Sequence, residues 1–353
     1  MREYTVAVVG CGVGKLHLEA WKALPGKFSV RMVCDLNAEA AREVAGKFGV
    51  PETSTDLSAV LARRDIDIID ICTPSGTHAA LSMQALAAGK HVICEKPLAG
   101  SLAEADALAA AAAKARGKLM PIFQYRYGNG VRKLKHLLDK GIPGRLYLAT
   151  IETLWKRLPA YYNNPWRGRW KTELGGTLTT HAIHAHDLLC WIAGPPRSVF
   201  ARTTTRVNTI EVEDCAAAAL TMADGSLATL SVTVGAMSEI SRLRFCFENL
   251  TAESSTAPYS PGSEPWTFIP ANDEVASQIE AALADFRPKK ERFTGQFEDF
   301  HAALESGGEP PITTGDARGS IELLTALYHS AATGAAVDVP LGPDHPRYQG
   351  WQP

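Results

Sequence analysis

The chain has 353 residues, of which 46% are hydrophobic and 21% charged, and its formal net charge is −2. These values are typical of a globular protein with two domains and exclude a basic surface for nucleic acid or anionic membranes. No apolar run could span a bilayer, and a strand is predicted almost from the first residue, so we expect no transmembrane helix and no signal peptide. Seven cysteines are scattered without CxxC spacing, several of them in apolar stretches, which is typical of reduced, buried thiols in a cytoplasmic protein.

Apolar runs and stretches with helical spacing alternate over the first third of the chain. Strands are predicted at 4–9, 30–34, 66–72, 92–94 and 118–123. Helices are predicted between them, at about 16–24, 38–48, 57–63, 77–88 and 102–116. Such alternation predicts an α/β fold with a doubly wound parallel sheet of the Rossmann type, which we place at residues 1–123.

The first predicted strand ends in a glycine-rich turn that leads into a helix, Gly10-Cys11-Gly12-Val13-Gly14. Glycines let the backbone turn tightly and approach a pyrophosphate, which then lies at the helix N-terminus. The third glycine comes one residue earlier than usual, so we expect an altered or shortened turn. The alternative is a plain turn without a ligand.

The second predicted strand ends at Asp35, where an acid binds the adenosine ribose hydroxyls and repels a 2′-phosphate. Leu36 follows directly, with no arginine that could accommodate the phosphate, so the sequence favours NAD over NADP. The alternative is that Asp35 only begins the turn into the next helix.

The third and fourth predicted strands each end abruptly in polar residues and a proline. The two segments are Thr73-Pro74-Ser75-Gly76-Thr77-His78 and Glu95-Lys96-Pro97. Because open parallel sheets bind ligands beyond the carboxyl ends of their strands, we expect Lys96 to face a ligand. Its ammonium could hydrogen-bond an oxygen that gains negative charge as a hydride leaves, and Glu95 would help to keep it charged. The alternative is a surface ion pair.

These motifs, at these spacings, resemble the glucose–fructose oxidoreductase/inositol dehydrogenase (Gfo/Idh/MocA) family, and the resemblance covers most of the chain. It implies a Rossmann domain followed, at 124–353, by an α/β domain on a large open, mostly antiparallel sheet. In the family this sheet often forms the oligomer interface, so a homodimer or homotetramer is expected.

The resemblance also implies roles for single residues. Lys96 matches the lysine that touches both the nicotinamide ribose and the substrate hydroxyl, and Pro97 matches a proline that is often cis. The expected cofactor contacts are Gly10, Cys11, Gly12, Val13, Gly14, Asp35, Leu36, Thr73, Pro74, Ser75, His78, Glu95, Lys96 and Gln124.

The remaining two thirds of the chain read mainly as a scaffold. Strands are predicted at 146–155, 198–205, 216–222, 227–234, 242–248 and 337–341. Helices are predicted at about 131–138, 274–283, 295–305 and 317–333. The Ser- and Pro-rich stretch 251–270 is predicted to be an irregular loop that could fold over the active site or against a neighbouring subunit.

Two segments of this second part are candidates for substrate binding. Tyr125 and Arg126 resemble the family's segment at the domain junction. Residues 161–170 form an aromatic- and arginine-rich loop, in which flat apolar faces beside donors suit a sugar ring. Trp166 and Arg167 are the preferred contacts there, and the alternative is an aromatic cluster that only anchors the core.

The segment 175–187 is the second chemical centre, and it opens a predicted helix that continues to about residue 192. Three histidines and an aspartate could suggest a metal site, but the pattern resembles the family's catalytic motif, so we expect no metal. His184 then matches the catalytic histidine and Asp187 the downstream aspartate. Thr180 stands where many polyol-oxidising members carry aspartate, and His181 or another acid could replace it at the substrate.

These patterns together predict an NAD-dependent dehydrogenase that oxidises a secondary hydroxyl of a sugar, polyol or glycoside. His184 would accept the hydroxyl proton, and Lys96 would polarise the oxygen. Two alternatives stay open: a glycoside-cleaving enzyme that uses tightly held NAD, and a non-catalytic dinucleotide-binding sensor.

Overall fold

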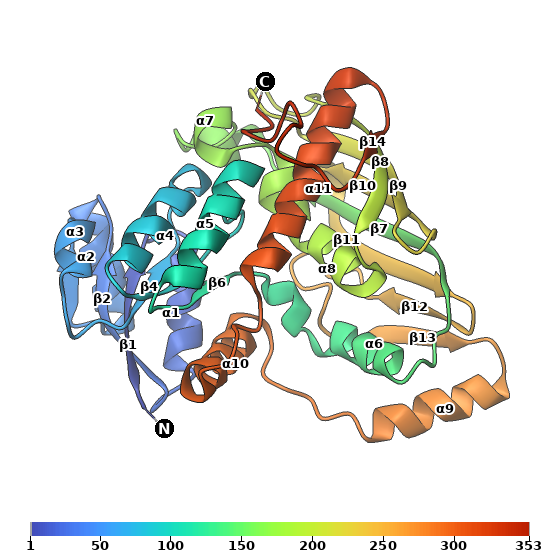
Figure 1. Cartoon of the computed structure of the whole chain (residues 1–353), viewed down its shortest axis with the longest axis horizontal. Coiled ribbons are helices and arrows are strands. Elements are labelled where there is room, and N and C mark those ends of the chain that lie inside the picture. Colours follow the sequence, from blue (N-terminus) through green and yellow to red (C-terminus); the bar gives the residue numbers. More distant parts are fainter. Residues whose placement is uncertain (1, 353) are drawn as a thin grey trace. The chain divides into compact units, whose positions relative to one another are not determined.

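A six-stranded parallel sheet forms the centre of the first unit in the computed structural model, which describes residues 2–352 (Figure 1). Its strands, in spatial order, are β3 (Glu52–Ser54), β2 (Phe28–Cys34), β1 (Tyr4–Val9), β4 (Ile68–Ile71), β5 (His91–Cys94) and β6 (Leu119–Pro121). All neighbouring pairs run parallel. The strand order reverses beside β1, which confirms the predicted doubly wound sheet. The sequence analysis missed β3 because its three polar residues make no apolar run.

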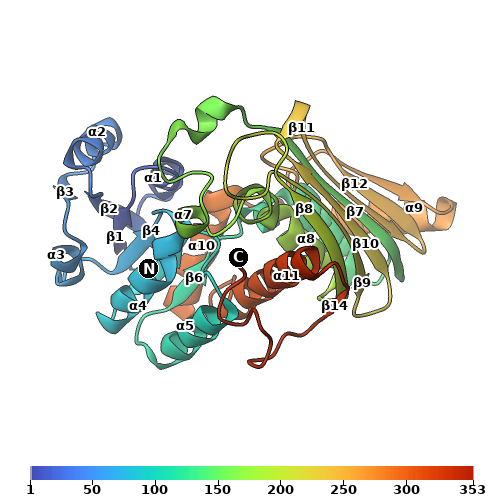
Figure 2. The same ribbon diagram turned by 90° about the horizontal axis from the view of Figure 1, so that it is seen from above.

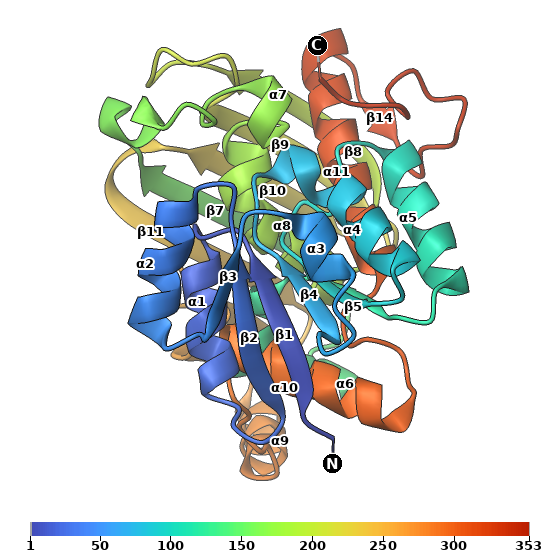
Figure 3. The same cartoon turned by 90° about the vertical axis from the view of Figure 1, so that its left-hand side faces the viewer.

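Helices cover both faces of this sheet, as Figure 3 shows. Helices α1 (Gly14–Lys22) and α2 (Ala38–Phe48) lie on one face, and α3 (Leu57–Leu61), α4 (His78–Ala87) and α5 (Leu102–Lys114) lie on the other. Side chains cap three of them. Asn37 accepts hydrogen bonds from the N–H groups of Glu39 and Ala40, Asp56 accepts one from Ser58, and Ser101 accepts one from Glu104.

The first unit runs to Ile122 and takes up the chain again at Phe293–Arg318, while the second unit comprises Phe123–Arg292 and the residues from Gly319 on. The first boundary lies beside the one that we placed after residue 123. Residues 293–318, which we assigned to the second domain, pack with the first unit instead. The reason is aromatic burial, because Phe297 of α10 (Arg292–Ser306) stacks on Trp21 with ring centroids 3.9 Å apart.

The second unit is built on an eight-stranded sheet. Its strands, in spatial order, are β13 (Trp266–Pro270), β12 (Leu250–Ser254), β11 (Gly235–Phe247), β7 (Leu146–Lys156), β10 (Leu227–Thr233), β9 (Cys215–Met222), β8 (Pro196–Thr204) and β14 (Val337–Asp338). Within this sheet, only the pair β7 and β10 is parallel among the described strands, so the predicted mostly antiparallel sheet is confirmed.

Helix α8 (Ile183–Ala193) packs along one face of this sheet (Figure 2). The other helices of the unit are α6 (Asn129–Asp139), α7 (Trp170–Glu173), α9 (Asp273–Ala284) and the larger part of α11 (Thr314–Thr333). The opposite face carries exposed apolar side chains such as Leu148, and a depression of about 310 Å³ lined in part by Glu152 and Arg242. Within the described residues, no helix combines the length and low polarity that crossing a bilayer requires.

The prediction of an irregular loop over 251–270 is wrong at both ends. β12 pairs with β11, and β13 pairs with β12, so only the residues between them are irregular. Scattered serines, threonines and prolines hid the strand pattern, while the burial of Trp266 against Phe245, with ring centroids 6.5 Å apart, anchors the edge of the sheet.

Phe297→Ala should lower the free energy of unfolding of the first unit by about 3–5 kcal/mol, since a ring that is 0% exposed would leave a cavity beside Trp21. Denaturant unfolding followed by tryptophan fluorescence measures this change. Met83→Ala is the matched control, because Met83 is 40% exposed in the same unit, and its effect should stay within about 0.5 kcal/mol. Equal losses in the two variants would contradict the assignment of residues 293–318 to this core.

Candidate active site

The glycine turn between β1 and α1 leaves room for a ligand at the backbone itself. Gly10 has φ +104°, and a Cβ there would lie 2.6 Å from the carbonyl oxygen of Cys72, so no other residue fits. At Gly12, no atom lies within 4 Å of an added Cβ. A phosphate can therefore approach this open turn beside the N-terminus of α1, as the sequence analysis expected, although Gly14 already lies in the helix.

Asp35 fixes the same turn from the end of β2. Its Oδ2 accepts a hydrogen bond from the N–H of Cys11 at 2.8 Å, and its Oδ1 accepts one from Asn37 at 2.9 Å. Each carboxylate oxygen has two lone pairs, so Asp35 can still accept hydrogen bonds from ribose hydroxyls. Leu36 beside it is 93% exposed and offers an apolar surface. This geometry fits an adenosine at the carboxyl end of β2.

At the end of β4, His78 braces two loops. It is buried, and its ring nitrogens lie 2.8 Å from the carbonyl oxygens of Pro97 and Thr73. Burial lowers the pKa of His78, while hydrogen bonds to these carbonyls oppose the shift. Pro74 and Ser75 lie half-buried in the adjoining turn. His78 thus links the segment after β4 to the segment after β5.

Lys96 follows β5, at the same edge of the sheet as the glycine turn, since β1, β4 and β5 are parallel neighbours. Its backbone N–H donates to Oε2 of the buried Glu95 at 3.0 Å, and the Lys96–Pro97 peptide bond is cis. The backbone of Lys96 is therefore held in place, and its side chain is half-buried.

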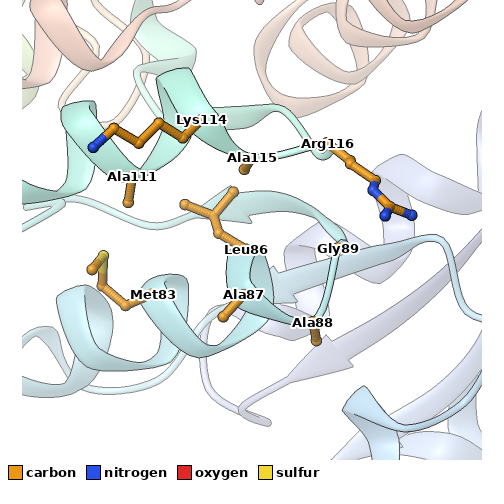
Figure 4. Close-up of a pocket in the computed structure, with 9 residues that line it drawn as sticks. All are labelled: Met83, Leu86, Ala87, Ala88, Gly89, Ala111, Lys114, Ala115 and Arg116. Carbon is orange, nitrogen blue, oxygen red and sulfur yellow. The ribbon is translucent and has the colours of Figure 1, made fainter.

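A surface cavity of about 530 Å³ lies elsewhere on the first unit, between the ends of α4 and α5 (Figure 4). Leu86 points between the two helices, and Lys114 and Arg116 extend to opposite sides. Because α4 and α5 end where β5 and β6 begin, this cavity lies at the amino ends of the strands. It is therefore separate from the candidate cofactor edge.

In the second unit, His184 of α8 lies beneath an aromatic side chain. The ring of Tyr125 stacks on the imidazole with centroids 4.6 Å apart and planes 29° apart. Both residues are buried, and Phe123 contacts the imidazole edge-on. Gln124 is also buried, and its Oε1 has no hydrogen-bond partner in the part of the chain that the structure describes, so it can serve a ligand.

Two predicted substrate contacts, Arg126 and Asp187, bind each other. The Nε and Nη2 atoms of Arg126 donate to the carboxylate of Asp187 at 2.8 and 2.6 Å, and both residues are buried. A bidentate pair of this kind joins the segment η2 (Gln124–Tyr127) to α8. His186 on the same helix is wholly buried, and burial lowers its pKa to about 3, so it is neutral.

The helix predicted from residue 175 does not begin regularly. Leu178–Ala182 forms a π-helical turn, and regular α-helix follows only in α8. Buried Glu213 holds the start of this turn, because its carboxylate accepts hydrogen bonds from the N–H groups of Gly176 and Leu178, both at 2.9 Å, and from the hydroxyl of Tyr328. A Cβ at Gly176 would lie 1.8 Å from the Glu213 carbonyl oxygen, so only glycine fits. A π-turn often marks a functional site.

The π-turn fixes the tautomer of His181. The Thr180 hydroxyl donates to the carbonyl of Gly176 at 2.7 Å, so its oxygen must accept from Nδ1 of His181, 2.6 Å away. Neutral His181 therefore carries its proton on Nδ1 and presents Nε2 as an acceptor, 3.5 Å from the hydroxyl of Tyr161. Thr180, in the position where an aspartate was expected, thus orients a second imidazole.

Arg167 lies between two rings of the predicted aromatic loop. Its guanidinium is 4.0 Å from the centroid of Tyr161 and 4.2 Å from that of Trp166, and it donates to Glu173. All of these contacts lie within the second unit. Trp166 and Arg167 are half-buried, so both retain surface that a ligand can reach.

The sequence analysis missed a second arginine beside His181. Arg157 lies over the rings of Trp155, Tyr161 and Tyr259, and it pairs with Glu239 at 2.5 Å. Trp155 meets the imidazole of His181 edge-on, with centroids 5.1 Å apart. His181, Glu239 and Tyr259 are far from Arg157 in the sequence, so no local spacing reveals these contacts.

Two family models match this chain. Residues 4–123 match an oxidoreductase family with an NAD-binding Rossmann fold, and residues 131–253 match the GFO/IDH/MocA C-terminal domain. The chain belongs to the Gfo/Idh/MocA family. The six-stranded sheet therefore belongs to the NAD-binding Rossmann domain of a family oxidoreductase, and the eight-stranded sheet belongs to its C-terminal domain.

Named relatives in this family are dehydrogenases. The levoglucosan dehydrogenase of Pseudarthrobacter phenanthrenivorans is 32% identical over 217 residues, which cover 58% of this chain and 55% of that relative. The D-apiose dehydrogenase of Paraburkholderia graminis is 25% identical over 96% of this chain and 90% of its own length. The WlbA dehydrogenase of Bordetella pertussis, solved with NADH and UDP-GlcNAcA, is 28% identical with a TM-score of 0.84, covering 97% of this chain and 100% of that chain.

Glu213 should make the stability of the second unit depend on pH. Burial raises its pKa from 4.5 to about 7, against the opposing effect of its three donors. A carboxyl whose pKa is raised by folding stabilises the folded state fully at pH values below the pKa that it has in the unfolded chain. This stabilisation is lost as the pH rises through the folded-state pKa of about 7. Glu213→Gln cannot ionise, so from about pH 5 to about pH 8 the wild type should lose about 2–3 kcal/mol relative to this variant.

Denaturant unfolding at several pH values measures the difference. Glu211→Gln is the control, because Glu211 is exposed close by in the sequence, and its curve should run parallel to that of the wild type. A parallel curve for Glu213→Gln as well would show that Glu213 does not titrate in this range.

Proposed function

We propose that this chain is an NAD-dependent dehydrogenase that oxidises a secondary hydroxyl of a sugar, polyol or glycoside. The observation that carries the proposal is the shared sheet edge of the first unit, where the open glycine turn, Asp35 and Lys96 follow parallel strands β1, β2 and β5. The printed names of the relatives, which include levoglucosan and D-apiose dehydrogenases, support a carbohydrate substrate.

We propose NAD as the cofactor, with NADP a poorer ligand. NAD, when bound, accepts the hydride, and the chain supplies binding and proton transfer. The glycine turn and the N-terminus of α1 would hold the pyrophosphate, and Asp35 would bind the ribose hydroxyls and repel a 2′-phosphate. The position of Asp35 directly after β2 supports NAD over NADP.

The proposed chemistry needs one cation and one base. Lys96 would hydrogen-bond the substrate oxygen and stabilise the negative charge that develops as hydride leaves. His184 would accept the hydroxyl proton, since an imidazole titrates near neutral pH. The stacked ring of Tyr125 and the oriented imidazole of His181 support a substrate site around this helix. Trp166 and Arg167 would contact the sugar from the aromatic loop.

A panel of sugars, inositols, glycosides and nucleotide sugars, tested with NAD and with NADP, should show reduced nicotinamide with at least one compound. Lys96→Ala should lower kcat/KM by about 100-fold or more, with little change in NAD affinity. His184→Asn should lower kcat by about 100-fold and remove the decline toward acid pH, where the imidazole is protonated.

Lys114→Ala is the matched control, because Lys114 is an exposed lysine of the same unit, and it should keep wild-type kinetics. Release of an aglycone without net NADH would instead indicate the glycoside-cleaving alternative. NAD binding with no turnover of any compound would indicate the sensor.

We also propose a cytoplasmic homodimer or homotetramer formed through the exposed face of the second sheet. The seven cysteines are all free, which supports a reducing compartment. Exposed apolar side chains on the sheet, such as Tyr147 and Leu227, support the interface. Light scattering should give a mass of twice or four times 38.0 kDa, and a monomer mass would contradict this proposal.

A further inference from the structure

A buried histidine that the sequence analysis did not single out lies beneath the glycine turn. His17 is in α1 and is 0% exposed. Its Nδ1 lies 2.9 and 3.0 Å from the two carboxylate oxygens of Asp70, and its Nε2 lies 3.1 Å from Oε1 of Glu95. A neutral imidazole has one N–H, so its other nitrogen would turn a lone pair toward a carboxylate. Between two carboxylates, this geometry therefore favours a proton on each ring nitrogen.

A metal ion is a poorer explanation for the same cluster. Ligand atoms of His17, Asp70 and Cys72 lie within 4.8 Å of one another. However, the indole N–H of Trp21 already donates to Asp70 at 2.8 Å, and a cation bound there would face this donor. Burial also raises the pKa of Cys72, so in the absence of a metal its sulfur is a protonated thiol. Hydrogen bonds thus account for the cluster.

The surroundings of His17 decide its charge. Burial by itself would lower the pKa of His17, but Asp70 and Cys72 on one side raise it well above the usual value. Glu95 faces the other nitrogen, and α10 packs the rings of Phe293 and Phe297 against the imidazole, with centroids 4.4 and 5.3 Å away. Between two buried carboxylates the charged imidazole is favoured over the neutral one, because without it each carboxylate would be a buried, unpaired charge.

This contact joins three segments of the candidate cofactor site. His17 lies in the helix that begins at the glycine turn, Asp70 lies in β4, and Glu95 follows β5. The second oxygen of Glu95 accepts the backbone N–H of Lys96 at 3.0 Å. We propose that His17 is a constantly charged positioning residue, an imidazolium that fixes Glu95 and, through it, the backbone that carries Lys96.

The charge of His17 can be tested on the full-length protein without any substrate. In ¹⁵N-histidine NMR, the signals that disappear in His17→Gln should show both ring nitrogens protonated at neutral and mildly alkaline pH. In Asp70→Asn, the same signals should titrate at lower pH, because one of the two carboxylate charges is gone. A neutral His17 at pH 7 in the wild type would overturn the proposal.

The positioning role needs a second measurement, NADH binding followed by fluorescence. His17→Gln should weaken binding by about tenfold or more, since small displacements at a site have large effects on its ligands. His301→Gln is the matched control, because His301 is a buried histidine of the same unit that contacts the carbonyl of Arg2. The affinity of this variant for NADH should stay within about twofold of that of the wild type, because a substitution far from the binding site does not couple to it.

Comparable NADH binding by wild type and a folded His17→Gln would overturn the positioning role. The positioning role rests on the proposed function, because NADH binding and the link to Lys96 both belong to it, and the link predicts a fall in kcat beyond the change in NADH affinity. If no substrate is turned over, the dehydrogenase proposal fails, while the NMR and NADH measurements still decide the charge and role of His17.

Discussion

A buried histidine between two buried carboxylates is the interaction on which the candidate site of the first unit depends. His17 contacts Asp70 through one ring nitrogen and Glu95 through the other, and all three residues are buried. Buried charges of one sign are strongly unfavourable alone, so each member of the cluster needs the others in place. The contact therefore ties the helix after the glycine turn to the ends of two strands, where ligands of open parallel sheets bind.

In the second unit, carboxylates also stabilise irregular segments, here by accepting backbone hydrogen bonds. Glu213 holds the glycines before the π-turn, and Asp214 next to it accepts three backbone hydrogen bonds, from residues 206, 207 and 208. Unpaired backbone N–H groups cannot be buried at low cost, so irregular backbone near a site needs such acceptors. Glu173 does the same for the N–H of Gly168 in the aromatic loop.

The irregular backbone also affects the histidine-rich segment 175–187. The sequence analysis predicted one helix from residue 175, but a π-turn at Leu178–Ala182 precedes α8. Asp187 is occupied by Arg126, and Thr180 orients His181. The segment therefore presents two imidazoles, one stacked on Tyr125 and one beside Tyr161.

The amino-acid sequence by itself determined the parallel sheet, the glycine turn and the polar strand ends at Asp35 and Lys96, because these follow from local periodicity and from short motifs. It also determined family membership. Only the tertiary structure decided that residues 293–318 pack on Trp21, that β12 and β13 extend the sheet, and that His17 meets Asp70 and Glu95. These features join residues far apart in the chain, and their stability comes from burial and charge pairing, which leave no spacing in the sequence to read.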